Sequence, residues 1–145
     1  MAKTLLNYNA TVVTPITNGV SIPVPRFPAA VQIAATSVFI DPANPAHLPN
    51  KVELNATIGF SIDFDSPNIL VRILRAGTEI FYAQAEFDKL EADIDDAVIS
   101  VHMVDANVPA GTQNYQLIVE DRDGQMDARA TVVGPIVFSA MAIGG

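Results

Sequence analysis

The residues that could carry chemistry are few, and their spacing does not form a catalytic set. The chain has two histidines, His47 in a proline-rich segment and His102 in an apolar run, and it has no cysteine. Neither histidine has the spacing that a metal site or a catalytic triad requires. No serine lies in a Gly-x-Ser-x-Gly motif, and glycine-rich phosphate loops are missing from the sequence. The sequence therefore predicts a protein that is not an enzyme.

Carboxylates are the one group of side chains that could hold a metal ion. The candidate ligands are Asp93, Asp95 and Asp96, at the end of the acidic segment 86–96. Calcium prefers such oxygen ligands, so a calcium site at these three residues is one interpretation. The other is a solvated acidic surface. No other cofactor is expected.

The charge balance narrows the classes of partner. The 145 residues include 8 basic and 16 acidic side chains, a net charge of −8. Such a chain lacks the positive charge with which proteins bind nucleic-acid backbones or anionic membranes. No apolar run is long enough to insert into a membrane, and residues 1–9 do not resemble a secretory signal peptide. We therefore expect neither nucleic acid nor membrane insertion.

The charge and the prolines are unevenly distributed. Residues 1–50 carry only Lys3, Arg26 and Asp41, so the negative charge belongs to residues 51–145. Seven of the ten prolines lie between positions 15 and 49. Because proline lacks an amide donor, this region should form edge strands and loops. We expect residues 1–28 to be an extended arm or a first edge strand, and residues 29–145 to form one domain.

Alternation with a period of two dominates the rest of the chain. Residues 51–64 alternate apolar and polar side chains, which predicts a strand with one wet face. Residues 98–104 are apolar on both faces, which predicts a central strand. A turn at 121–124 suggests that 115–120 and 126–133 form a hairpin. In total we expect eight to ten strands in an all-β, antiparallel jelly-roll sandwich.

The N-terminal arm is the main functional candidate. Its apolar side chains are Leu5, Leu6, Tyr8, Val12, Val13 and Ile16. Fourteen extended residues reach about 46 Å, against a radius of gyration of about 15 Å for a domain of this size. The arm could therefore add a strand to a neighbouring subunit. Alternatively, it is the first strand of its own sheet.

The C-terminal half also carries a family resemblance. Residues 108–117, with Pro109-Ala110-Gly111 leading to Tyr115, are followed by 130–134 and a closing apolar strand at 136–143. This pattern resembles the jelly rolls of the tumour-necrosis-factor and complement-like superfamily. Residues 69–77 are similar to a segment of bacterial spore-surface (exosporium) proteins of that type. The resemblance implies a homotrimer, or a subunit of a surface layer, appendage or phage fibre, without catalysis.

Together these observations predict a structural subunit that assembles with itself, as a homotrimer or a filament, outside the cell or on the surface of a particle. The alternative is a β-sandwich module that binds carbohydrate or another ligand, in one version with calcium.

Overall fold

The structure is a computed structural model that describes residues 2–64, 67–87, 95–122 and 129–145. Within these ranges the chain forms nine strands and no helix, which confirms the all-β prediction. The strands are β1 (Thr4–Thr14), β2 (Ile22–Pro23), β3 (Val31–Ile40), β4 (Asn50–Phe64), β5 (Asn68–Arg75), β6 (Thr78–Glu86), β7 (Asp95–Ala106), β8 (Gly111–Asp121) and β9 (Arg129–Gly144). A helix of the length and apolarity needed to cross a membrane is not found among the described residues.

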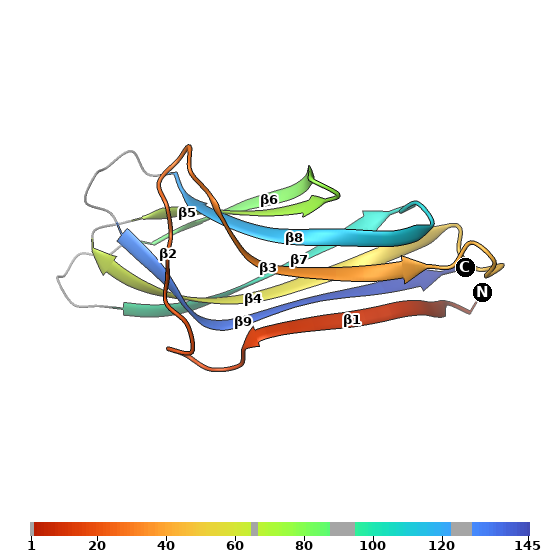
Figure 1. Ribbon diagram of the computed structural model, residues 1–145, viewed down its shortest axis with the longest axis horizontal. Helices are drawn as coiled ribbons and strands as arrows, with labels where there is room; N and C mark the ends of the chain where they lie inside the picture. The colour runs from red at the N-terminus through yellow and green to blue at the C-terminus, as the bar shows by residue number, and fades with distance from the viewer. Residues whose placement is uncertain (1, 65–66, 88–94, 123–128) are drawn as a thin grey trace.

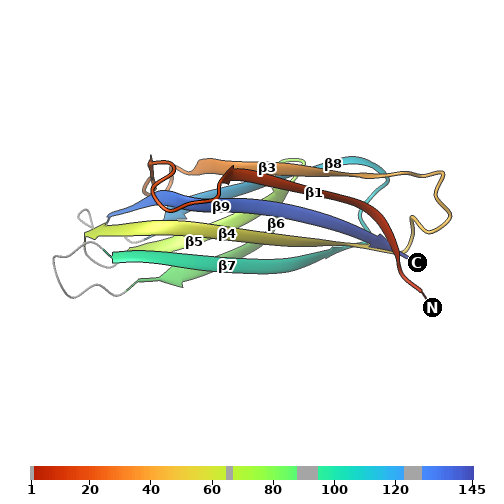
Figure 2. The same ribbon diagram turned by 90° about the horizontal axis from the view of Figure 1, so that it is seen from below.

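The strands form two antiparallel sheets that run along the length of the molecule (Figure 1). The first sheet has the order β1-β9-β4-β7, with β2 paired to β9, and the second has the order β3-β8-β5-β6. Figure 2 shows the four long strands of the first sheet crossing the molecule in that order. Both ends of the chain lie at the same end of the sheets (Figure 1).

One hydrophobic core lies between the two sheets. The apolar half of the β4 alternation, each residue at most 2% exposed, is Val52, Leu54, Ala56, Ile58, Phe60 and Ile62. The second sheet adds Ile69, Val71 and Ile73 from β5 and Tyr115, Leu117 and Val119 from β8. The buried half of the alternation predicted for residues 51–64 is confirmed up to Ile62, because successive side chains of a strand point to opposite faces. The predicted wet face extends only to Thr57, since Gly59 is buried and Ser61 is 8% exposed. Each large buried side chain stabilises the fold by about 1.5–3 kcal/mol.

The proline-rich region forms an edge strand and loops, as predicted. β3 lies at the edge of the second sheet, and residues 41–49 connect it to β4. The Asn50 side chain, which is buried, anchors this end of the molecule. Its Oδ1 accepts from the Val108 amide at 2.8 Å, and its Nδ2 donates to the carbonyls of Val108 at 2.9 Å and His47 at 2.8 Å.

Two of the strand predictions are wrong. β7 is not a central strand but the edge of the first sheet, with Val98 57% and Val104 43% exposed. Its inner side chains pack against the core while its outer ones face solvent, and the sequence pattern alone does not distinguish a central strand from an edge strand of this kind.

Residues 115–120 and 126–133 do not form a hairpin, because β8 and β9 belong to different sheets. A turn signal marks where a chain reverses, but it does not specify the sheet that the chain then joins.

Gly59 allows β4 and β9 to approach each other at an irregular point in their pairing. The register of the two strands shifts between Ile58 and Phe60, where Gly134 has a φ of 99°. A Cβ atom on Gly59 would lie 1.9 Å from the carbonyl oxygen of Gly134, so no side chain fits there. The two central strands can remain paired only with glycine at this position.

Gly59→Ala should therefore destabilise the protein by about 3 kcal/mol, since backbone atoms would have to move to admit one methyl group. The measurement is urea unfolding followed by circular dichroism. Asn55→Ala, an exposed position on the same strand, is the control and should change the free energy of unfolding by less than about 0.5 kcal/mol. Equal stability of the two variants would contradict the conclusion that a side chain does not fit at Gly59.

Candidate interaction surface

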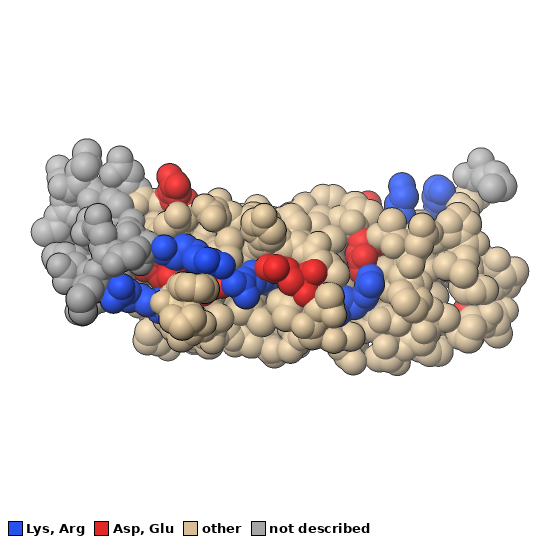
Figure 3. All heavy atoms as spheres, turned by 90° about the horizontal axis from the view of Figure 1, so that it is seen from above, with Lys and Arg blue, Asp and Glu red and all other residues tan. Residues whose placement is uncertain are grey.

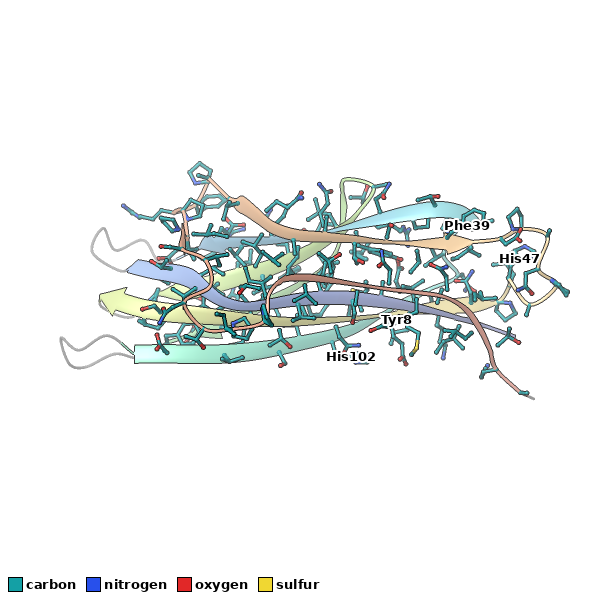
Figure 4. The ribbon with its side chains drawn as sticks, turned by 60° about the horizontal axis from the view of Figure 1, so that its bottom comes forward. Tyr8, Phe39, His47 and His102 are labelled. Carbon is teal, nitrogen blue, oxygen red and sulfur yellow. The ribbon has the colours of Figure 1, made fainter. Side chains whose placement is uncertain are left out.

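The first sheet has an outer face, which we define as the side chains of β1, β9, β4 and β7 that point away from the core. The pairing registers align these side chains in rows across the four strands. Four successive rows are Leu5–Ile143–Lys51–Ala106, Tyr8–Met141–Glu53–Val104, Ala10–Ser139–Asn55–His102 and Val12–Val137–Thr57–Ser100. Figure 4 looks towards this side of the molecule and shows Tyr8 and His102 on it.

Large apolar side chains are exposed on this face. Eleven large hydrophobic residues are exposed among those described, and five of them belong here: Leu5, Tyr8, Val12, Val98 and Val104. They range from 43% to 61% exposed. Between them β9 contributes Val137, Met141 and Ile143, which are half-buried. Isolated exposed apolar residues are common on proteins, whereas a contiguous group indicates an interaction site.

The outer face is also almost free of charge. Among its described side chains, the charged ones are Lys51, Glu53 and Asp96, and the two rows through Asn55 and Thr57 have none. The negative charge of the chain is therefore carried elsewhere.

The second sheet and the residues beside it carry ion-paired charges. Arg72 pairs with Glu120 at 2.5 Å and with Glu79 at 3.4 Å, and Arg122 approaches Glu120 at 3.4 Å. The Arg122 guanidinium also lies over the Phe27 ring, 4.2 Å from its centre. Figure 3, seen from above, shows basic and acidic side chains next to one another along the molecule. The two sides of the protein thus differ in charge, although the second sheet also exposes Phe39 and Tyr82.

The structure brings together three of the six residues predicted for the arm. Leu5, Tyr8 and Val12 lie on the outer face. Leu6 instead packs partly against the core, Val13 sits at a shift in the β1 register, and Ile16 lies beyond the end of β1. β1 itself pairs with β9 of the same chain, so within one chain it is an edge strand. Contact between these residues and another subunit remains a prediction.

Sequence reasoning missed the contribution of β7 and β9 to this surface. Val98, His102 and Val104 share one face of β7, and their alternation is visible in the sequence. The pattern predicts a buried face on each side of the strand, because the sequence does not show which strands are its partners. For the same reason the outward half of β9 could not be separated from its buried half.

A polar cluster fixes the inner side of β7 to the second sheet. The Tyr115 hydroxyl of β8 donates to Asp105 Oδ2 of β7 at 3.0 Å, and Arg75 Nη1 of β5 donates to the same oxygen. Burial is the main cause that raises the pKa of Tyr115, and the charge of Asp105 raises it further. The hydrogen bond from Arg75 to Asp105 raises the pKa of that arginine. This cluster holds β7 so that Val98 and Val104 face outward.

A pocket of about 430 Å³ lies at the end of the first sheet, where Lys3, Asn50, Lys51, Glu53 and Ile143 are among the lining residues. Lys3 Nζ donates to the Gly145 carbonyl at 2.8 Å. The volume is within the range of small-molecule sites, about 300–1,000 Å³. The pocket therefore has the size to hold a small ligand, and its charged lining residues are Lys3, Lys51 and Glu53.

The predicted calcium ligands are only partly described. Asp93 and the side chain of Asp95 lie outside the described residues, while Asp96 is an exposed residue near the start of β7. Among the residues that the structure describes, no group of three or more histidine, cysteine, aspartate or glutamate side chains is arranged to hold a metal ion.

Comparisons with known proteins identify no family. No protein-family model and no curated protein matches the chain. Among solved structures, the chain is similar to dimeric latent PorU from Porphyromonas gingivalis, with 11% sequence identity and a TM-score of 0.38. That match covers 97% of this chain but 13% of PorU. A likeness of this degree does not bear on function.

The Tyr115 cluster generates a test at high pH. The fold favours the neutral phenol, whereas tyrosine in the unfolded chain ionises near pH 10. Stability from this group is therefore complete below about pH 10 and is lost as the pH rises above it. Relative to Tyr115→Phe, the wild-type chain should lose about 1.4 kcal/mol of unfolding free energy between about pH 9 and about pH 11.

Urea unfolding of both chains across this pH range gives the difference directly, because other titrating groups are common to the two. At neutral pH the variant should lose about 1 kcal/mol, the value of one hydrogen bond. Parallel pH profiles for the two chains would show that Tyr115 does not contribute as described.

Proposed function

We propose that the protein is a structural subunit that assembles with copies of itself through the outer face of the first sheet. The observation that carries the proposal is the coincidence of exposed apolar side chains and few charges on that face. Such a subunit suits a surface layer, appendage, filament or fibre, outside the cell or on a particle. No catalytic role is proposed.

The charge distribution favours a second copy as the partner. Two molecules that each carry a net charge of −8 repel one another, and screening limits that repulsion to about 8 Å at physiological salt. Contact therefore costs least where neither surface carries charge. The rows through Asn55 and Thr57 on the outer face meet this condition.

The area of the face is adequate for a stable contact. Eleven residues of β1 span about 36 Å, and four strands span about 19 Å across the sheet. The resulting face of about 700 Å² compares with about 800 Å² per partner in a standard protein interface. Assembly through this face requires no further domain.

The strand order supports the finer assignment of a jelly roll. With the short β2 left out, the first long strand pairs with the last (β1 with β9), and the second pairs with the seventh (β3 with β8). The remaining pairs, β4 with β7 and β5 with β6, follow the same rule. A long hairpin rolled into two sheets has this order. It is the architecture implied by the resemblance to the tumour-necrosis-factor and complement-like superfamily, in which assembly rather than catalysis is expected.

Light scattering and electron microscopy of the purified chain test the proposal. We expect particles with a mass that is a multiple of 15.4 kDa at micromolar concentration. Tyr8→Asp would place an unpaired charge in the interface and should weaken assembly about 30-fold, the effect of losing a residue worth about 2 kcal/mol. A wild-type chain that remains monomeric would refute the proposal.

Tyr82→Asp is the matched control, because Tyr82 is 64% exposed, close to the 59% of Tyr8, but lies on β6 of the second sheet. It should leave the mass of the particles unchanged. Equal weakening by both variants would show that the outer face has no special role.

A ligand-binding module is the second candidate, and the pocket beside Lys3 and Lys51 is the observation that favours it. Calorimetric titrations with calcium chloride, a monosaccharide and a small dicarboxylate separate the two functions. The assembly proposal expects no saturable heat from any of them. Saturable heat that Lys51→Ala removes would favour ligand binding in this pocket, and heat from calcium that Asp93→Ala removes would favour a calcium-dependent module.

A further inference from the structure

Within the described residues, the middle of β7 lacks the devices that commonly protect a free edge strand. Edge strands are commonly shielded by bulges, charges, proline or short length. The pairings of β1, β3 and β6 each contain a register shift, whereas that of β7 with β4 runs without one from Lys51–Ala106 to Ile62–Asp95. β7 is 12 residues long, and residues 97–104 contain no Asp, Glu, Lys, Arg or Pro.

The outer edge of β7 is also unoccupied by the rest of the described chain. Its backbone pairs with β4 on one side, and no described strand or loop is hydrogen-bonded to the other side. The edge of β1, by contrast, is partly covered, because the Phe39 amide of β3 donates to Asn7 Oδ1 at 3.1 Å. β7 therefore presents a row of free amide and carbonyl groups along a strand whose middle, residues 97–104, is uncharged.

We infer that two copies of the chain join by antiparallel pairing of their β7 strands about a two-fold axis. This inference rests on the proposed function and adds the edge and the register of one contact. With the axis perpendicular to the sheet, the two first sheets become continuous and their outer faces lie on the same side. A contact of this kind is isologous and closes as a dimer, and it joins two outer faces with few charges into one larger surface.

The sequence of β7 complements itself in one register. Opposite residues in an antiparallel pair share a face, so the axis must pass beside one residue of the strand. With Val101 at the axis, Val98 lies opposite Val104 and Ser100 opposite His102 on the outer face. On the inner face Ile99 lies opposite Met103. Apolar pairs of this kind stabilise neighbouring strands.

The neighbouring registers are less favourable. With Ser100 at the axis, the carboxylate of Asp96 lies opposite Val104. With His102 at the axis, Asp105 lies opposite Ile99. Each alternative sets a carboxylate against a large apolar side chain, Val104 or Ile99. The Val101 register instead sets Asp96 opposite Ala106 and Asp105 opposite Ala97, which carry only a methyl group and lie at the ends of the paired segment. This self-complementarity favours a second copy over an unrelated strand as the partner.

Engineered disulfides test the register, and the absence of native cysteine makes the result unambiguous. In an antiparallel pair, directly opposite residues have Cα atoms about 4.5–5.5 Å apart, which is within the range that a disulfide can bridge. Residues that lie diagonally, one pair further along the strands, have Cα atoms too far apart for a disulfide. The variant Val98→Cys/Val104→Cys should form a covalent dimer of twice the chain mass under mild oxidation. Ser100→Cys alone and His102→Cys alone report the two alternative registers, and each should cross-link at least about fivefold less.

A second variant tests the edge without a disulfide. Ser100→Lys adds a charge to the middle of β7 and should weaken the dimer about tenfold, while Thr78→Lys on β6, the edge of the second sheet, should not. Both positions are exposed, so both variants should fold.

The outcomes separate this inference from the proposed function. Cross-linking of Ser100→Cys or His102→Cys in preference to the double variant overturns the register. Particles of multiple mass that cross-link in none of the variants overturn the β7 contact and leave self-assembly standing. A covalent product that is not twice the chain mass overturns the choice of a second copy. A chain that is monomeric throughout overturns both.

Discussion

β4 and β9 lie side by side in the middle of the first sheet, and each places every second side chain in the core. Because the side-chain period of a strand is two, a shift of one residue in their pairing would send the buried row to solvent. The register of these two strands therefore determines which residues the outer face presents. The close approach at Gly59 and Gly134 belongs to the same pairing. The candidate surface is in this sense a consequence of how the core is packed.

The two sheets divide the chemistry of the surface between them. The second sheet holds Arg72, Glu79 and Glu120 in an ion-paired network, and Arg122 covers Phe27. The first sheet leaves apolar side chains exposed with few charges between them. Charge keeps a protein soluble and apart from its copies. A protein that assembles through one surface benefits when its charge lies on the others, and the arrangement seen here is of that kind.

Local signals in the sequence predicted those features that depend on near neighbours in the chain. The alternation from Val52 to Ile62 identified a buried row correctly, and the prolines between 15 and 49 correctly indicated loops and an edge strand. The prediction for 98–104 was wrong, because an apolar row can face either a core or a free surface. The three exposed arm residues Leu5, Tyr8 and Val12 were found in the sequence, whereas their neighbours on β7 and β9 were not.

Three properties can be read from the sequence alone: the all-β class, the alternating faces of the strands, and the separation of a nearly neutral N-terminal third from an acidic remainder. These properties follow from side-chain type and from spacings of one or two residues. The three-dimensional packing was needed to establish which strands lie at the edges, that β8 and β9 join different sheets, and that β1 and β7 border one face with few charges. Those features depend on pairing between residues as far apart as Leu5 and Ile143. The packing of the whole core selects this long-range pairing, and a local sequence pattern does not predict it.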